Sequence, residues 1–189
     1  MAFTDNRVRY TKMVLSQALL KILKKKSIDQ VTIKEICDEA QVNRGTFYLH
    51  YATPNDLLME IEHQFIDEHL GYFGTYIQEN RETGHLANLF SCILNNQELC
   101  LILMGKNGNP RFLTRLQEIM RPAVVDGWCR EFPHYRWDDL DYVFDFVFTG
   151  SMRLILNWIE DAKGLSTMAL ARRLDRLGHY AHLAIQEFN

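Results

Sequence analysis

The sequence predicts an all-α fold, and three observations support that prediction. The 189 residues include only four prolines and ten glycines, too few to supply the turns of a sandwich or barrel with many short strands. Apolar residues recur every three or four positions through most long segments, which is the period of a helix with one buried face. The composition is 47% apolar and 24% charged, which is ordinary for a globular protein and excludes a disordered tail protein or a fibrous repeat.

The longest apolar stretches are much shorter than a membrane span. The mostly apolar run 143–148, which Asp145 interrupts, is one of them, whereas a transmembrane helix needs ~20 apolar residues. No charged start leads into an apolar signal core. We therefore expect no membrane association and a cytoplasmic location.

Charge is distributed unevenly along the chain. The net charge is −3, but residues 1–53 carry nine Lys and Arg against five acids, whereas residues 54–189 carry twelve against nineteen. A basic segment indicates a surface that meets an anion, and an acidic one indicates a surface that does not. The sequence thus predicts two domains, a head of residues 1–53 and a body of residues 54–189.

The first two helices are expected inside the head. Apolar residues spaced by three and four begin near Thr11 and continue to Leu23, and three lysines then favour the negative end of the helix dipole. Thr32 and Glu35 have the spacing of a capping box, in which each side chain bonds the other residue's amide. A second, short helix is therefore expected to start at Ile33.

A third helix is expected after only a few residues. Asn43 offers its cap, and the helix is predicted over residues 44–51. Thr53, Pro54 and Asp56 then signal a long fourth helix, because proline fits the first helical position and an acid suits the first turn. Second and third helices joined by so short a turn have helix-turn-helix geometry.

The third helix presents a polar face once its apolar residues are packed. Val42 and Phe47 can face the first helix, and Gly45 keeps the outer face low, so that backbone can approach a groove. The helix starts at Ile33 and Asn43 offer unpaired amides to phosphate oxygens. A solvated face on an ordinary bundle is the alternative. The polar face consists of Asn43, Arg44, Thr46, Tyr48 and His50.

Two segments in the head are distinctive, VTIKEI at 31–36 and AQVNRGTFYLHY at 40–51. With the surrounding residues 10–57 they resemble the TetR family of transcriptional regulators. The resemblance implies a homodimer of nine- or ten-helix chains, whose heads enter successive major grooves of double-stranded operator DNA and whose bodies dimerise and hold an effector. It implies phosphate contacts at Thr32 and Tyr48, and phosphate or base-edge contacts at Arg44, Thr46 and His50. The predicted DNA-binding set is thus Thr32, Asn43, Arg44, Gly45, Thr46, Tyr48 and His50.

One position departs from the family pattern. Members commonly have a lysine at the start of the fourth helix, where this chain has Pro54, so a backbone contact is expected to be missing. Affinity would then depend more on Arg7, Arg9 and Lys12, unless these residues form only a frayed basic tail. Because repression is commoner in the family, we expect a repressor. A transcriptional activator of the same fold, or a helical-bundle interaction protein without a DNA function, is the alternative.

The body divides into helices at three breaks. Polar or glycine- and proline-containing loops are expected at 81–85, 105–110 and 131–137. Helices are expected between them over 86–103, 111–130, 138–161 and 166–188. The third of these is apolar over most of its circumference, and only the row Asp141, Asp145 and Thr149 is expected to be exposed. Such a helix needs cover on two sides, from the body core and from a second subunit.

The last helix carries a heptad-like seam that alternates steps of four and three residues. Packing within the chain explains such spacing equally well. The resemblance favours the dimer, because the last two helices of family members pair across a twofold axis. The predicted interface is Leu170, Leu174, Leu177, Ala181 and Ala184.

An effector cavity is predicted inside the body, although aromatic residues at helical spacing also suit a plain core. Few positive charges belong to the candidate walls, so we expect a small apolar or weakly polar effector. The candidate lining residues are Phe65, His69, Tyr72, Phe73, Phe90, Met104, Trp128 and Phe144.

No enzyme chemistry is predicted. A di-iron bundle needs two helical Glu-x-x-His motifs, and only Glu60 with His63 has that spacing without a glycine or proline inside it. His179 and His182 lack a convincing third metal ligand. The four cysteines form no C-x-x-C pair and are interpreted as reduced thiols. Neither a metal nor a cofactor is therefore expected.

Overall fold

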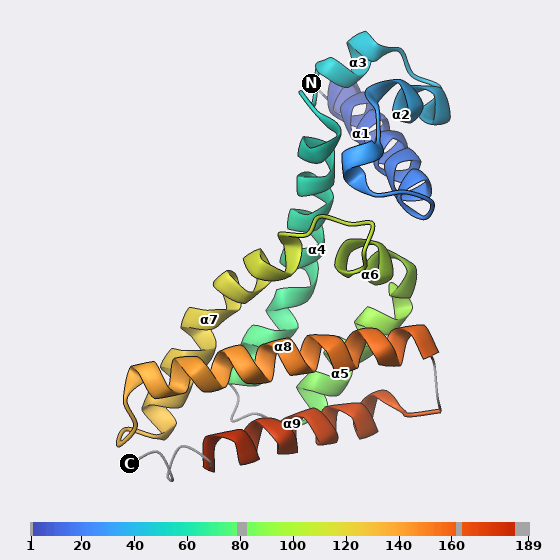
Figure 1. Cartoon of the computed structure of the whole chain (residues 1–189). Helices are drawn as coiled ribbons and strands as arrows, with labels where there is room; N and C mark the ends of the chain where they lie inside the picture. The colour runs from blue at the N-terminus through green and yellow to red at the C-terminus, as the bar shows by residue number, and fades with distance from the viewer. Residues whose placement is uncertain (1, 79–82, 162–163, 184–189) are drawn as a thin grey trace. The chain divides into compact units, whose positions relative to one another are not determined.

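The computed structural model describes residues 2–78, 83–161 and 164–183, and these form helices joined by short connections (Figure 1). No strand occurs among them, so the predicted all-α fold is confirmed. In chain order the elements are α1 (Ala2–Leu23), the 3-10 helix η1 (Ile28–Gln30), α2 (Ile33–Ala40), α3 (Arg44–Tyr48), α4 (Pro54–Gln78), α5 (Thr83–Asn95), α6 (Gln97–Met104), α7 (Phe112–Glu131), α8 (Trp137–Asp161) and α9 (Thr167–Leu183).

The helices form two compact units. Unit 1 comprises Met1–Ile66 together with Glu98–Phe112, and unit 2 comprises Asp67–Gln97 together with Leu113–Asn189. Unit 1 therefore includes a segment that is distant in sequence from the three N-terminal helices. This division describes packing, whereas the predicted boundary at residue 53 concerns function and stays a prediction.

Unit 1 is built on a core of fully buried aliphatic and aromatic side chains. They are Leu15, Leu19, Leu23, Ile36, Phe47, Leu57, Leu58, Leu103 and Phe112. The loop between α6 and α7 is fastened to this unit by Asn107, whose side-chain amide donates to the Leu23 carbonyl at 3.0 Å. The Asn107 carbonyl in turn accepts from the Ile28 amide at 3.2 Å. One residue thus bonds both sides of the turn that connects α1 to η1.

The caps of the head helices agree with the local sequence signals, whereas two helix ends do not. The Thr32 capping box and the Asn43 cap are both present, and α4 starts at Pro54 as predicted. The first helix begins at Ala2, well before the expected start near Thr11. The third helix ends at Tyr48 instead of continuing to residue 51, because the His50 amide donates to the Phe47 carbonyl, three residues back, in place of the carbonyl four residues back.

The single helix predicted over 86–103 is wrong. The chain forms two helices, α5 and α6, with a break between them at Asn96. The Asn96 side-chain amide donates to the Cys92 carbonyl at 3.0 Å, and its backbone amide donates to the carbonyls of Cys92 and Ile93. These bonds close the end of α5 before α6 begins at Gln97.

A related finding concerns membrane-spanning length. Among the described residues no single helix is both long enough and apolar enough to cross a bilayer, and α5 and α6 meet that composition only as a bent pair.

Unit 2 packs α9 against α5 and α8. Leu140, Ile159 and Ala171 are fully buried in this unit, and Phe90 is nearly so. The Trp158 indole donates to the Leu165 carbonyl at 2.8 Å, which fixes the end of α8 against the turn that leads to α9.

In the predicted exposed row on α8, Thr149 is exposed and the Asp145 side chain is 49% exposed, whereas the prediction is wrong for Asp141, whose side chain is 27% exposed. Asp141 and Asp145 are partly covered, because both form ion pairs with Arg121 of α7. The Arg121 guanidinium also lies 5.1 Å from the centre of the Phe144 ring. The most exposed apolar side chains of α8 are instead Tyr142 and Phe146.

Candidate nucleic-acid interface

Helix α3 is short. Residues 43–51, which include it, form four rows on its surface, and the members of each row are four positions apart in the sequence. The inward row consists of Phe47 and Tyr51, whose aromatic rings are both buried with centroids 5.7 Å apart, whereas Asn43, one turn earlier, is exposed. This row attaches α3 to the rest of unit 1. The side chains of the other rows are therefore left for an outside partner.

The start of α3 is fixed by Asn43. Its side-chain oxygen accepts from the Thr46 amide at 2.7 Å and from the Thr46 hydroxyl at 3.0 Å. Both predicted contact residues thus already hold the helix cap. Among the described residues the Asn43 amide nitrogen has no hydrogen-bond partner within the chain, so it keeps its donors for a ligand.

Two rows of α3 are exposed. Arg44 and Tyr48 form one, with the tyrosine ring 58% exposed, and Gly45 and Leu49 form the other. Within the described part of the chain Arg44 forms no ion pair. The remaining row, Thr46 and His50, is half-buried. Most of the predicted polar face therefore lies outside, and the structure adds Leu49, which the polar pattern did not mark.

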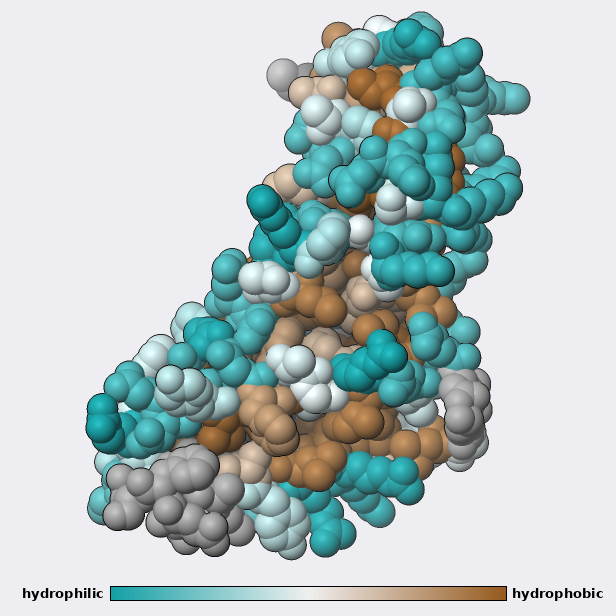
Figure 2. Space-filling model, in the orientation of Figure 1, coloured by the Kyte–Doolittle hydropathy of each residue, from teal (hydrophilic) through white to brown (hydrophobic). Residues whose placement is uncertain are grey.

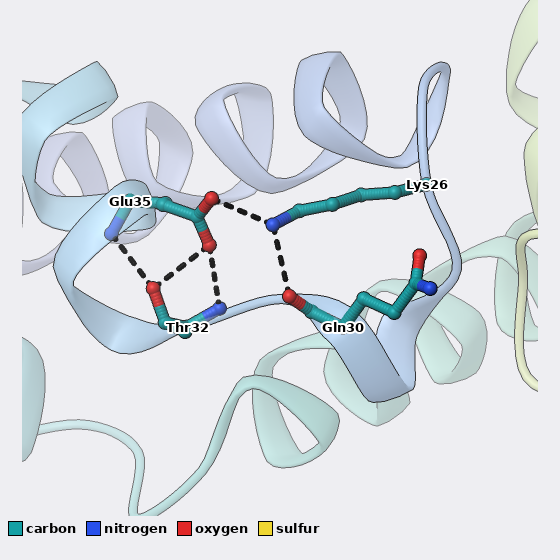
Figure 3. A network of polar contacts seen from close by, with 4 residues as sticks. All are labelled: Lys26, Gln30, Thr32 and Glu35. Atoms are coloured by element: carbon teal, nitrogen blue, oxygen red, sulfur yellow. Dashed lines mark hydrogen bonds and ion pairs between the residues drawn. The ribbon is translucent and has the colours of Figure 1, made fainter.

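The start of α2 is held by a network of four residues (Figure 3). Both the amide and the hydroxyl of Thr32 donate to one carboxylate oxygen of Glu35, at 3.0 and 2.8 Å. The other oxygen accepts from the Lys26 ammonium at 2.6 Å, and that ammonium also donates to the Gln30 carbonyl at 2.8 Å. The Lys26 bond, followed by those from Thr32, lowers the pKa of Glu35 to about 2.

This network changes the chemistry available at Thr32. The side chain is exposed, as predicted for a phosphate contact, but both of its donors are directed at Glu35. The amides of Ile33 and Lys34 come next, and helix geometry gives them no partner inside the helix. An anion at this end of α2 would meet those two amides first.

The basic residues of α1 differ in how they are used. Lys12 is bound to Glu60 at 2.9 Å and lies 5.7 Å from the centre of the Tyr51 ring. Burial, together with the nearby Glu60, raises the pKa of Tyr51. Arg7 and Arg9 are exposed on the first turns of α1. Arg7, Arg9 and Lys12 are the cations predicted to support DNA binding. Of these, Lys12 instead forms an ion pair inside unit 1.

Family comparisons agree with this geometry. The model described as "Bacterial regulatory proteins, tetR family" matches residues 15–61, which include the whole helix-turn-helix. A second model, "Transcriptional regulator C-terminal region" of the same family, matches residues 80–180. The chain belongs to the TetR family. Its N-terminal helices are thus the DNA-binding helix-turn-helix of a transcriptional regulator.

Solved structures of this family share the fold at low sequence identity. A TetR transcriptional regulator from Streptococcus agalactiae 2603V is 18% identical, with a TM-score of 0.66 over 94% of this chain and 98% of that one. FadR of Thermus thermophilus, a TetR family repressor solved with lauroyl-CoA, is also 18% identical, with a TM-score of 0.55 over 88% and 92%. No curated protein matches the sequence.

The predicted effector-binding residues are buried wherever the structure describes their side chains. Phe65 and Met104 belong to unit 1, where the Phe65 ring lies 6.2 Å from that of Phe112. The side chains of Tyr72 and Phe73 lie outside the described residues. The other members of the set, His69, Phe90, Trp128 and Phe144, belong to unit 2.

Two of the unit 2 residues contact each other. The Trp128 and Phe144 rings are 6.4 Å apart at their centres. His69 lies 3.4 Å from the Asn96 side chain, close to the bend between α5 and α6. These contacts are those of a packed core, so the proposed lining remains a prediction.

A cleft of about 530 Å³ lies between α1 and α2. It shares no residue with the predicted effector set, and its walls carry lysines and carboxylates in place of aromatic rings. Lys21 is already paired with Glu39 at 2.5 Å, and Lys26 with Glu35 at 2.6 Å. The lining residues are Lys21, Ile22, Lys25, Lys26, Glu35, Asp38 and Glu39.

The predicted dimer seam on α9 divides into buried and exposed parts. Leu170 and Leu174 are buried within the single chain, where α9 packs on α5 and α8. Leu177 is exposed and Ala181 is partly covered, whereas Ala184 lies outside the described residues. The intrachain alternative therefore accounts for the first half of the seam.

Metal-ligating side chains are not grouped in the described part of the chain, where no three His, Cys, Asp or Glu residues could share one ion. Glu60 forms an ion pair with Lys12, and His63 is exposed.

Proposed function

We propose that this TetR-family chain is an effector-responsive repressor that binds operator DNA as a homodimer in the cytoplasm. The observation that carries the proposal is the exposed row of Arg44 and Tyr48 on α3. Arg44, which forms no ion pair with the residues that the structure describes, and the adjacent Tyr48 hydroxyl offer donors to phosphate oxygens, while the buried Phe47 row keeps α3 in place. The functional division at residue 53 belongs to the same proposal.

Phosphate binding at α3 has support from the helix starts. The amides of Ile33 and Lys34 at the start of α2 and the Asn43 side-chain amide at the start of α3 are donors of the kind that phosphates accept. Arg7 and Arg9 add exposed positive charge on α1. These groups supply the sequence-independent part of binding, which positions the head on the duplex.

Dimerisation has support from α8 and α9. Tyr142 and Phe146 of α8 are 77% and 75% exposed, and Leu177 and Tyr180 of α9 are 56% and 57% exposed. Apolar surface gathers over these two helices (Figure 2). Exposed apolar patches of this kind mark association sites, and a stable interface needs about 800 Å² from each partner. We therefore move the proposed interface to these four residues, with Ala181 of the predicted set retained.

The effector has support from the apolar interior of unit 2. Phe90, Trp128 and Phe144, with His69, give buried apolar surface and one polar group. A relative with 18% identity was solved with lauroyl-CoA, which has a long apolar chain. An effector with an apolar part fits this interior. Its binding would switch the protein fully only if it preferred one spacing of the two heads by ~5.5 kcal/mol.

The test is a selection of sequences from a pool of randomised DNA duplexes, followed by electrophoretic shift with the enriched sequence. We expect two related half-sites centred about one helical turn or a multiple of it apart. Affinity should fall ~10³- to 10⁵-fold between 50 and 200 mM salt, since a dimer would neutralise about 6 to 10 phosphates. A flat salt response would contradict the DNA function.

Two outcomes of the selection identify the alternatives. If no sequence is enriched even at low salt, the chain is an interaction protein that keeps the fold, as the proline in place of the usual lysine at Pro54 would allow. If the enriched site lies upstream of a gene whose transcription rises with the protein present, the regulator is an activator.

A further inference from the structure

Leu49 is the most exposed large apolar side chain in the described part of the chain, at 80%, and it lies directly after α3. Its backbone remains helical, and its amide donates to the Gly45 carbonyl at 3.2 Å. The two residues therefore share one row, one turn apart. Helical side chains lean toward the N-terminus, so the Leu49 side chain leans over a residue that has no side chain of its own.

The residues beside Leu49 on α3 indicate which part of a DNA duplex its side chain would contact. Arg44 and Tyr48 present donors beside it, and the Phe47 row faces inward. A leucine side chain cannot hydrogen-bond a phosphate, so a contact between Leu49 and the DNA backbone would gain little. In the major groove the one apolar group on a base edge is the C5-methyl of thymine.

We propose that Leu49 selects thymine by packing on its methyl group, and this inference rests on the DNA-binding function proposed above. The bare Gly45 gives the base edge room beside the leucine. A Cβ at that position would lie 3.2 Å from the Asn43 side-chain oxygen, so a larger residue there would press on the α3 cap. Glycine thus preserves both the cap and the space in front of Leu49.

The experiment uses the full-length protein and the duplex enriched from the randomised pool. Each thymine in turn is replaced by uracil, which keeps every hydrogen-bonding group and lacks only the methyl. For the natural protein we expect at least one replacement in each half-site to weaken binding about fourfold, the effect of exposing one buried methyl-sized group. Leu49→Ala should bind the thymine and uracil duplexes equally, and Leu49→Met should retain part of the preference.

Two controls separate this result from a folding defect. Ile119→Ala removes a comparable exposed aliphatic side chain from α7 and should leave the thymine preference unchanged. Thermal unfolding of Leu49→Ala should match that of the natural protein, because a side chain 80% exposed contributes little to the core.

The outcomes are distinct. If the natural protein tolerates uracil at every position, or if Leu49→Ala keeps the same sensitivity as the natural protein, the inference about Leu49 is overturned while the DNA function stands. If the pool yields no enriched duplex, the proposed function fails and the inference fails with it.

Discussion

The Lys26 ammonium lies 2.6 Å from a carboxylate oxygen of Glu35, and this ion pair joins the segment after α1 to the first turn of α2. The same carboxylate accepts two bonds from Thr32. Helix α2 is thus fixed at the end where its free amides face outward. Since α2 and α3 pack together as the helix-turn-helix, this pair helps to position the DNA-binding surface.

The ion pair predicts an acid-dependent loss of stability. The pKa of Glu35 falls from 4.5 to about 2 on folding, first because of Lys26 and then because of Thr32. A lowered folded-state pKa stabilises the protein above the unfolded value, and that contribution disappears as the pH falls from about 4.5 toward 2. Urea unfolding across this range should show a steeper loss for the natural protein than for Glu35→Gln.

Two further variants test the cause of that loss. Glu118→Gln, which removes an exposed carboxylate from α7, should retain the full acid dependence. Lys26→Met removes the largest cause of the shift, so the Glu35 pKa measured by carbon NMR should rise toward 4.5. Parallel stability curves for the natural protein and Glu35→Gln would mean that the pair contributes nothing to folding.

Arg44→Ala and Tyr48→Ala should weaken DNA binding without changing the fold, because both side chains are exposed. For Arg44→Ala, loss of one charged phosphate contact in each subunit should reduce the slope of log affinity against log salt by about 0.9 per contact, or roughly two for a dimer. Tyr48→Ala removes a neutral hydroxyl, so it should weaken binding and leave that slope unchanged. Titrations at several salt concentrations measure that slope. Arg130→Ala on α7 is the matched control, and failure of either head variant to fold would place its side chain in the core.

The head could be predicted largely from sequence because its signals are local. The Thr32 and Glu35 capping box, the Asn43 cap and the start of α4 at Pro54 each involve residues within a few positions of one another. Helix starts of this kind are specified by hydrogen bonds that the neighbouring residues make themselves. Most of the candidate site could therefore be predicted from interactions between residues that are close in sequence.

The body was harder to predict because its contacts join distant segments. Asp141 and Asp145 have the spacing of an exposed row, and only their partner Arg121, twenty or more positions away, shows why they are partly covered. Leu174 fits an intersubunit seam equally well by spacing, but α5 and α8 bury it within the chain. Periodicity identifies a face and does not identify what covers it.

Leu49 shows a different limit. A leucine in a helical segment is by default assigned to the core, and here neither the polar pattern nor the apolar pattern included it. The row that it shares with Gly45, four positions earlier, is the one sequence feature that could have indicated an exposed position.

Phe146→Glu and Leu177→Glu should each convert the proposed dimer to monomers, because a carboxylate would be buried in an apolar interface without a partner. Sedimentation velocity should show the smaller species, and circular dichroism should show unchanged helix content. DNA affinity should fall strongly, since one head alone engages one half-site. Unchanged dimers would place the interface elsewhere on the chain.

Two matched variants sharpen the interface test. Ile119→Glu, at an exposed position on α7, should leave the dimer intact. Leu174→Glu should unfold unit 2 instead of separating the subunits, because Leu174 is buried within the single chain.

Gly108→Ala should destabilise unit 1 through the loop that Asn107 fastens. A Cβ at Gly108 would overlap the carbonyl oxygens of Ile102 and Leu103, and both are backbone atoms that cannot rotate away. We expect a loss of ~1–3 kcal/mol in the free energy of unfolding, as for other overpacked sites. Asn107→Ala removes only its side-chain bond to Leu23 and should cost about 1 kcal/mol.

Hydrogen exchange locates the effect of the Gly108 substitution. The Ile28 amide donates to the Asn107 carbonyl, so its protection should fall in Gly108→Ala more than that of amides in α8. Gly84→Ala is the matched control, because a Cβ there meets nothing within 4 Å and the helical position tolerates alanine. If Gly108→Ala were as stable as Gly84→Ala, the loop would not be held against α6 as the structure has it, and Asn107 would lose its role in fixing the turn after α1.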